Sequence, residues 1–216
     1  MTISDTQQIL ILIPTYNEIE NVELIISRIR AVGINASILF VDDNSPDGTG
    51  KLLKNMGRQD PQLHILHRSG KLGVGSAHID GIYWAYDQGF QTLVTMDSDQ
   101  THSPEDILEF INGLADADVV VGSRFKDKNS LPGWSIYRKI MTFAGHFLTM
   151  SLLKMPFDAT GAFRAYNLEN IPREIFEMVE STGYSFFYES LHRLHKNKIP
   201  ISEFSTHLPS RTYGHS

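Results

Sequence analysis

Short runs of continuous apolar residues alternate with segments of helical periodicity along the first part of the chain. Ile9–Ile13 is one such run, and Pro14 ends it. A run without any polar residue is typical of a strand that is buried on both faces of a parallel sheet. The next segment, from Asn17 to about Val32, places apolar residues on one helical face and stops at Gly33. This alternation predicts an α/β fold in which helices sandwich a mostly parallel sheet.

The same alternation continues as far as residue 123 and becomes less regular beyond it. Further strands are expected at 37–41, 63–66, 92–96 and 118–122, and further helices at 49–55, from the glycine-rich turn 68–75 to about residue 88, and after Pro104. A chain of 216 residues is long enough to bury a full core. We therefore expect residues 1–216 to form a single domain.

Composition narrows the class of protein. The chain has no cysteine, which fits a reducing compartment and excludes a thiolate metal site. The net charge of −6 argues against a general nucleic-acid binder. No uninterrupted apolar run reaches the roughly 20 residues that cross a bilayer, and the polar N-terminus has no signal-peptide pattern. We expect a cytoplasmic protein without a nucleic-acid partner.

The charge is distributed unevenly between the two parts of the chain. Residues 1–123 contain 7 Lys and Arg against 17 Asp and Glu, a net of −10. Residues 124–216 contain 12 against 8, a net of +4. An acidic half that can bind a metal ion, joined to a basic half, suits a protein that handles two separate phosphate groups.

Two aspartates follow directly after the apolar run Thr92–Met96. Asp97 and Asp99 are spaced i, i+2 behind a buried strand, so both carboxylates point toward the same side of its exit turn. Such a pair is a hard-oxygen site for Mg²⁺ or Mn²⁺, which keeps coordination positions free for diphosphate oxygens. Ser103 is expected to cap the next helix. The pair therefore lies on a strand-to-helix loop, where open α/β sheets bind their ligands.

Seven loop segments follow one another along the chain with turn-forming and charged residues. They are 13–18 (Ile-Pro-Thr-Tyr-Asn-Glu), 41–49, 71–77, 96–99, 122–125, 158–164 and 211–216. In this order they resemble the family 2 glycosyltransferases, and among these the dolichol-phosphate mannosyltransferase catalytic subunits. The resemblance covers roughly residues 9 to 216. Each segment alone is a weak signal, but seven in the right order are a strong one.

The resemblance implies a GT-A nucleotide-sugar transferase fold. Residues 1–123 would be the nucleotide-sugar and metal half, and residues 124–216 the acceptor half. It implies inverting transfer of mannose from GDP-mannose to dolichyl or polyprenyl phosphate, with Mg²⁺ or Mn²⁺ as the cofactor. It also implies a peripheral location on the cytosolic face of a membrane, and it leaves open a membrane-anchoring subunit. Transfer of glucose or N-acetylglucosamine from a UDP-sugar remains an alternative, because relatives use different sugars through similar loops.

The first two strand ends carry the residues expected to bind the nucleotide. By resemblance, Pro14, Tyr16 and Glu18 frame the base and ribose. Asp43 ends the second strand, where a carboxylate can accept hydrogen bonds from the same groups. Ordinary turn chemistry is the alternative for all of them. We favour the nucleotide for Glu18 and Asp43, because strand ends at a switch point are binding positions, and the turn for Asp47.

The acidic loop carries the residues expected to bind the metal and the diphosphate. Asp97 and Asp99 should orient a divalent ion that neutralises the diphosphate as the sugar leaves. Ser98, between them, is expected to help bind the nucleotide-sugar donor. Thr101 holds the place where relatives often have a third ligand, so its hydroxyl is a candidate ligand.

Basic residues are expected to bind the phosphate groups. Arg124 and Arg211 match family arginines near the diphosphate or the acceptor phosphate, and guanidinium forks suit phosphate oxygens. Arg68 and Lys71, in the glycine-rich turn, are equally well explained as phosphate contacts and as solvated loop charges.

The acceptor itself explains why no obvious catalytic base stands out. A phosphate monoester has its second pKa at about 6, so at neutral pH much of it is already a dianionic nucleophile. Arg138 matches the family arginine that is thought to hold this phosphate. Asp158 is the alternative if a base is used, although an ordinary turn carboxylate explains it equally well.

The segment 135–157 has apolar residues at helical spacing and basic residues at its flanks. By resemblance it would lie in the membrane interface with its apolar side toward the lipid. On periodicity alone, a helix that covers the sheet is the more common explanation.

Two rival functions fit parts of the sequence. Asp97-Ser-Asp99-Gln-Thr101 also matches the D-x-D-x-T pattern of haloacid-dehalogenase-like phosphatases. That pattern normally ends the first strand, with an acidic pair downstream, whereas here the acidic pair Asp42-Asp43 lies upstream. The second rival is a receiver-like or nucleotide-sensing module, which would be much shorter and would not need the basic half.

Overall fold

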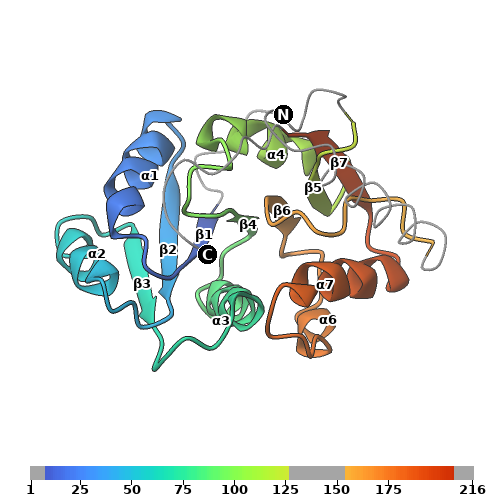
Figure 1. Cartoon of the computed structure of the whole chain (residues 1–216). Helices are drawn as coiled ribbons and strands as arrows, with labels where there is room; N and C mark the ends of the chain where they lie inside the picture. The colour runs from blue at the N-terminus through green and yellow to red at the C-terminus, as the bar shows by residue number, and fades with distance from the viewer. Residues whose placement is uncertain (1–7, 127–153, 207–216) are drawn as a thin grey trace, which may run out of the picture.

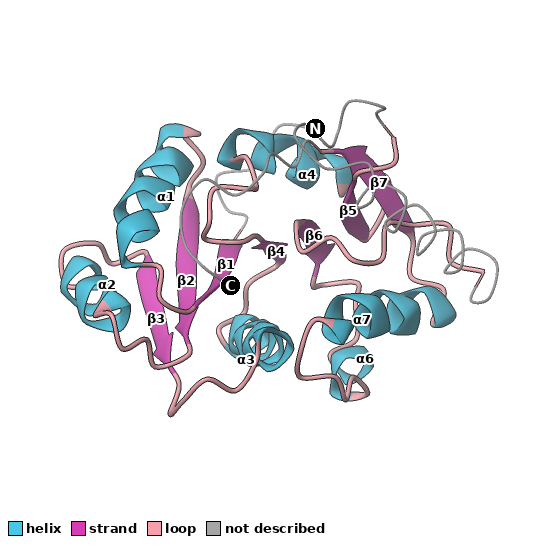
Figure 2. Cartoon of the chain, viewed as in Figure 1, coloured by secondary structure: helices cyan, strands magenta, loops and turns pink. Residues whose placement is uncertain are grey.

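The computed structural model describes residues 8–126 and 154–206. Within these residues seven strands form one sheet in the order β3-β2-β1-β4-β6-β5-β7, with helices on both faces (Figures 1 and 2). The strands are β1 (Ile9–Thr15), β2 (Ala36–Asp42), β3 (Leu63–His67), β4 (Thr92–Thr95), β5 (Val119–Ser123), β6 (Arg164–Asn167) and β7 (Ile201–Ser205). The helices are α1 (Ile19–Ala31), α2 (Thr49–Gly57), α3 (Val74–Asp87), the 3₁₀ turn η1 (Pro104–Asp106), α4 (Ile107–Gly113), α6 (Glu174–Glu177) and α7 (Ser185–Lys196). The predicted sandwiched, mostly parallel α/β architecture is confirmed.

The direction of the strands determines where the loops gather. β3, β2, β1 and β4 are parallel, and the register pairs Ile9 with Ala36 on one side and with Thr92 on the other. β6 runs antiparallel between β4 and β5, and β7 pairs parallel with β5. The carboxyl ends of β1, β2 and β4 therefore meet at one edge of the sheet, which is the edge where open α/β sheets bind ligands.

β1 connects the two halves of the core because its side chains alternate between the faces of the sheet. Ile9, Ile11 and Ile13 pack with α1, α2 and α4, whereas Leu10 and Leu12 pack with α3, α6 and α7. All five side chains are buried. Burial of each contributes about 1.5–3 kcal/mol relative to exposure, so this unbroken apolar run stabilises both layers of helices.

One helix start differs from the prediction, and a second lies where predicted but lacks the expected capping bond. The first helix begins at Ile19 rather than Asn17, because Asn17 has a left-handed φ of 58° that cannot start an α-helix. Ser103 occupies the cap position, but its hydroxyl makes no capping bond and donates instead to the carboxylate of Glu105. The helix opens with the 3₁₀ turn η1.

The last third of the chain contains two strands that the sequence analysis did not predict. β6 has four residues and starts with an arginine, and β7 alternates apolar and polar side chains. Neither has the continuous apolar run by which the earlier strands were found. Residues 135–153 of the expected interfacial segment lie outside the described residues. None of the described helices is long and apolar enough to cross a membrane.

The start of α3 packs closely against the segment that leads into α7. The backbone N–H of Ser76 donates to the carbonyl of Thr182 at 3.0 Å. A methyl group on Gly75 would lie 2.6 Å from the carbonyl oxygen of Gly183 and 2.6 Å from the Cβ of Phe186. This contact joins the first half of the chain to the last helix, and it requires glycine.

Gly75→Ala should therefore destabilise the fold even though alanine is the better helix former. We expect a loss of about 1–3 kcal/mol in the free energy of unfolding, because backbone atoms must move to accommodate the methyl group. Urea denaturation followed by circular dichroism measures it. Gly70→Ala is the matched control, since no atom lies within 4 Å of the added methyl group, and it should change stability by less than about 0.5 kcal/mol. Equal effects of the two changes would contradict the close contact.

Candidate active site

The acidic loop after β4 has a defined conformation. The backbone N–H and the hydroxyl of Thr101 both donate to Oδ1 of Asp99, at 3.1 and 2.5 Å. Gln100, between them, has a left-handed φ of 65°. Its side-chain oxygen accepts a 2.8 Å bond from Nη1 of Arg28 on α1. Thr101 therefore helps to fix the rotamer of Asp99, and its role as a direct metal ligand stays a prediction.

His102 fixes the backbone of Asp97, the other acid of the loop, although the sequence analysis gave it no role. The backbone N–H of Asp97 donates to Nδ1 of His102 at 2.9 Å, which requires that this nitrogen carries no proton. The imidazole is buried and stacks on Phe163, with ring centroids 5.0 Å apart. No local sequence signal marks His102, because its partner is a backbone group five residues earlier.

The acidic loop fits a divalent ion that is shared with a substrate. Among the described residues, no cluster of three or more His, Cys, Asp or Glu side chains that would hold a metal occurs. The Asp97 side chain is 39% exposed at the loop, so it is accessible to a ligand. Mg²⁺ and Mn²⁺ suit a pair of carboxylates, because such ions keep several positions for water and for phosphate oxygens. The residues present thus fit the predicted cofactor.

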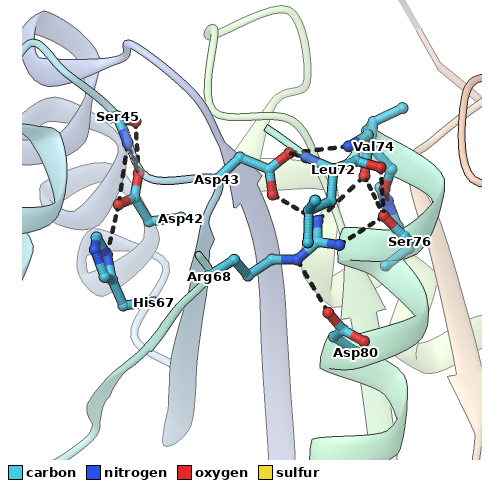
Figure 3. Close-up of polar contacts among 11 residues, drawn as sticks. Asp42, Asp43, Ser45, His67, Arg68, Leu72, Val74, Ser76 and Asp80 are labelled. Carbon is cyan, nitrogen blue, oxygen red and sulfur yellow. Dashed lines mark hydrogen bonds and ion pairs between the residues drawn. The ribbon is translucent and has the colours of Figure 1, made fainter. Parts of the chain in front are cut away.

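Asp43 and Arg68 form a buried ion pair behind the glycine-rich turn (Figure 3). Nη1 of Arg68 donates to Oδ1 of Asp43 at 2.5 Å, and Nη2 donates to the hydroxyl of Ser76 at 2.6 Å. Oδ2 of Asp43 accepts the backbone N–H groups of Leu72 and Gly73, both at 3.1 Å. Of the two explanations for Arg68, a solvated loop charge is wrong, because the side chain is buried. It ties β3 to the start of α3.

These contacts use three of the roughly four acceptor positions of the Asp43 carboxylate. Asp43 therefore shapes the glycine-rich turn from the end of β2, and its contact with a nucleotide stays a prediction. A cavity of about 440 Å³ lies beside this network, along the exposed side of α3. It includes Arg68 but none of the residues of the acidic loop.

The loop after β1 is held by the loop after β2. The backbone N–H of Glu18 donates to the hydroxyl of Thr49 at 3.1 Å, and the buried Glu18 carboxylate accepts a 2.6 Å bond from Asn21. Asp47 accepts the N–H groups of Ile19 and Thr49, each within 3.1 Å. The prediction that Asp47 shapes a turn is confirmed.

Tyr16 and Lys71 bring the first loop and the glycine-rich turn together. Nζ of Lys71 lies 4.2 Å from the centroid of the Tyr16 ring, which is a cation–π contact. Pro14, at the end of β1, is half-buried. The predicted nucleotide-binding residues Tyr16 and Glu18 thus lie on the loop after β1 and Pro14 lies at the end of that strand, next to the turn that Asp43 organises.

Arg124, directly after β5, forms a forked ion pair with the buried Asp158. Its Nε donates to Oδ2 at 2.8 Å, its Nη2 donates to Oδ1 at 2.7 Å, and its backbone N–H donates to Oδ2 at 3.1 Å. Burial acts to raise the pKa of Asp158, but the hydrogen bonds from Arg124 outweigh it and hold this pKa below its ordinary value. A carboxylate stabilised in this way is a weak base, so the contacts favour a positioning role for Asp158. Arg138 and Arg211 lie outside the described residues.

The parallel sheet, with its acidic loop at the carboxyl edge, has the GT-A-like fold of nucleotide-sugar transferases. One similar solved structure is glucosyl-3-phosphoglycerate synthase from Mycobacterium tuberculosis in complex with Mn²⁺, UDP and glucosyl-3-phosphoglycerate. It has a TM-score of 0.67 at 15% identity, over 98% of this chain and 73% of that one. Another is the mannosyltransferase PcManGT from Pyrobaculum calidifontis in complex with GDP-Man and Mn²⁺. Its TM-score is 0.60 at 17% identity, over 98% of this chain and 59% of that one.

Residues 10–172 match the model of glycosyl transferase family 2, and the chain belongs to this family. It is 34% identical over 210 residues to the undecaprenyl-phosphate mannosyltransferase of Micrococcus luteus. This alignment covers 97% of this chain and 86% of the relative. It is also 34% identical over 216 residues to the polyprenol monophosphomannose synthase of Mycolicibacterium smegmatis, covering 99% and 82%. The predicted family is confirmed.

The ion pair of Asp158 makes a prediction about acid stability. Because its pKa in the folded protein is lower than in the unfolded chain, the stabilisation is complete above about pH 4 and is lost as the pH falls further. Asp158→Asn should lower the free energy of unfolding at pH 7 by about 3 kcal/mol, since the Arg124 charge loses its partner. It should also make stability depend less on pH below about pH 4.

Urea denaturation at a series of pH values measures both effects. Asp116→Asn, at an exposed position, is the control and should keep the pH dependence of the unchanged protein. An Asp158→Asn variant with unaltered stability at pH 7 would show that the ion pair contributes nothing.

Proposed function

We propose that the protein is an inverting mannosyltransferase that moves mannose from GDP-mannose to a dolichyl or other polyprenyl phosphate. The observation that carries this proposal is the 34% identity, over nearly the whole chain, to two proteins named for mannose transfer to polyprenyl phosphates. A structural relative in complex with GDP-Man and Mn²⁺ supports the choice of donor. In this proposal residues 1–123 bind the nucleotide sugar and residues 124–216 bind the acceptor.

Asp97 and Asp99 would hold Mg²⁺ or Mn²⁺, with Ser98 and Thr101 on the same loop. When bound, the ion neutralises the negative charge that develops on the GDP leaving group. The chain prepares this site in advance: His102 holds the backbone of Asp97, and Thr101 holds the carboxylate of Asp99. Ligands that are already oriented need little reorganisation when the transition state forms.

Arg124 would supply positive charge to the phosphate groups from the other side of the site. Its forked contact with Asp158 fixes the plane of the guanidinium. The acceptor phosphate is largely dianionic at neutral pH, so it can attack the anomeric carbon without a dedicated base. Arg138 is the residue that we propose for holding this phosphate, and Arg211 would contact either this phosphate or the diphosphate of the donor.

The lipid acceptor requires the enzyme to work at a membrane surface. We place it peripherally on the cytosolic face, because the prenyl chain stays in the bilayer while the nucleotide sugar is water-soluble. The amphipathic segment 135–157, with its basic flanks, supports this contact. A membrane-anchoring subunit is compatible with the same arrangement.

A donor panel tests the proposed reaction. The protein is incubated with Mn²⁺, a short polyprenyl phosphate and radiolabelled GDP-mannose, GDP-glucose, UDP-glucose or UDP-N-acetylglucosamine, and label is counted in the organic phase. We expect transfer from GDP-mannose at a rate at least tenfold above that from any other donor. A preference for a UDP-sugar would reassign the sugar, and the absence of transfer from every donor would refute the proposal.

Removal of a carboxylate from the acidic loop tests the role of the metal. Asp99→Asn should lower kcat by about 10²–10³-fold, because the stabilisation of the leaving group is lost. It should also weaken Mn²⁺ binding in the presence of GDP, as measured by electron paramagnetic resonance. Asp116→Asn serves as the matched control and should leave both quantities unchanged. Normal turnover of Asp99→Asn would rule out the proposed metal site.

A further inference from the structure

Arg164, at the start of β6, is a fully buried guanidinium with a network of its own. Its Nε donates to the carbonyl of Gly161 at 2.8 Å, and its Nη1 donates to the hydroxyl of Ser190 at 3.1 Å. Its Nη2 donates to the carbonyls of Ala159 and Phe187, at 3.0 and 2.6 Å. All four acceptors are electrically neutral.

Burial of the Arg164 charge among neutral acceptors costs free energy. Within residues 8–126 and 154–206, Arg164 forms no ion pair with a carboxylate. His78, nearby, is buried as well, and burial lowers its pKa to about 4, so it is neutral at pH 7. A buried charge without a counter-charge stabilises a fold less well than an apolar side chain of similar size. Stability alone is therefore a poor reason for an arginine at this position.

The acceptors of Arg164 belong to two separate parts of the protein. Ala159 and Gly161 lie on the loop 158–163, whereas Phe187 and Ser190 lie on α7. The start of α7 is itself fixed against α3 through the close contact at Gly75. Arg164 thus fastens a loop to a part of the fold that cannot easily shift.

This loop carries Asp158, which orients Arg124 at the active site. Asp158 is 1% exposed, and its carboxylate receives the Nε, Nη2 and backbone N–H groups of Arg124. A second contact fixes the far end of the loop, where the hydroxyl of Thr95 on β4 donates to the carbonyl of Ala162 at 2.7 Å. Arg164 is therefore connected to Arg124 through the loop 158–163 and the ion pair between Asp158 and Arg124.

We propose that Arg164 is a positioning residue for the transfer reaction: by fastening the loop 158–163 to α7, it keeps Asp158, and through it Arg124, in the orientation that the phosphate groups require. This inference rests on the proposed function. Two phosphate-bearing substrates attract the Arg124 guanidinium, so its carboxylate anchor must not move when they bind. Donors whose orientation is set in advance stabilise a transition state more effectively than donors that must reorient.

A double-mutant cycle of Arg164→Lys with Arg124→Lys tests the proposal. Arg164→Lys keeps the positive charge but loses the planar guanidinium that binds several acceptors at once. It should lower kcat by about 10- to 100-fold, because Arg124 is no longer held in the right orientation, and leave the KM for GDP-mannose nearly unchanged. In the double variant, kcat should be no lower than in Arg124→Lys alone, because both changes remove the same contribution. Losses that multiply would show that Arg164 acts independently of Arg124 and would overturn the proposal.

Two further measurements separate this proposal from a loss of folding and from failure of the proposed function. Ser190→Ala removes only one bond to α7, so it provides a milder partner for the same cycle if Arg164→Lys does not fold. Hydrogen exchange at the Arg124 amide reports its bond to Asp158 without any turnover. Faster exchange in Arg164→Lys is expected, and Arg58→Lys, at an exposed position, is the control and should leave it unchanged. Unchanged exchange in Arg164→Lys would overturn the positioning role even if mannose transfer is confirmed.

Discussion

The parallel pairing of β1 with β2 and with β4 is the constraint on which the site depends. It brings the loops after these three strands to one edge of the sheet, although the first and the last of them are about 80 positions apart in the chain. The N–H of Asp43 donates to the carbonyl of Thr15, and the N–H of Met96 donates to that of Leu12, so the ladder continues into the loops themselves. Burial of β1 on both faces holds this edge in place, because a slip in register would move its apolar side chains to the wrong layer.

Two ion pairs, each between an aspartate and an arginine, then fix the loops that the sheet brings together. Asp43 with Arg68 shapes the glycine-rich turn, and Asp158 with Arg124 shapes the opposite side of the site. In both pairs the carboxylate is buried and also accepts backbone N–H groups. A buried ion pair adds little net stability, yet it defines one geometry at the expense of others. That property suits an enzyme whose reaction depends on the placement of charge around phosphate groups.

Sequence patterns located most of the sheet but not all of it. The runs that became β1, β2 and β4 are continuous and apolar, and a strand buried on both faces has no other common pattern. β6 and β7 escaped prediction because Arg164 and Glu203 interrupt their apolar character. Ser103 takes the predicted cap position, but its hydroxyl donates to Glu105 and accepts no backbone N–H. Residue type predicts the position of a cap, whereas the hydrogen bond that the side chain makes there depends on local geometry.

The sequence by itself determined the fold class, the family and the acidic loop at Asp97 and Asp99, because each of these depends on residue types at short, fixed spacings. Only the tertiary structure decided the partners of the charged residues. Arg68 and Arg164 bind groups that lie more than 20 residues away in the chain as well as nearby ones, and several partners of these arginines and of His102 are backbone atoms common to every residue. Every residue has the same backbone groups, so residue types do not reveal which backbone group a side chain will bind. The location of these hydrogen bonds is decided by how the folded chain packs.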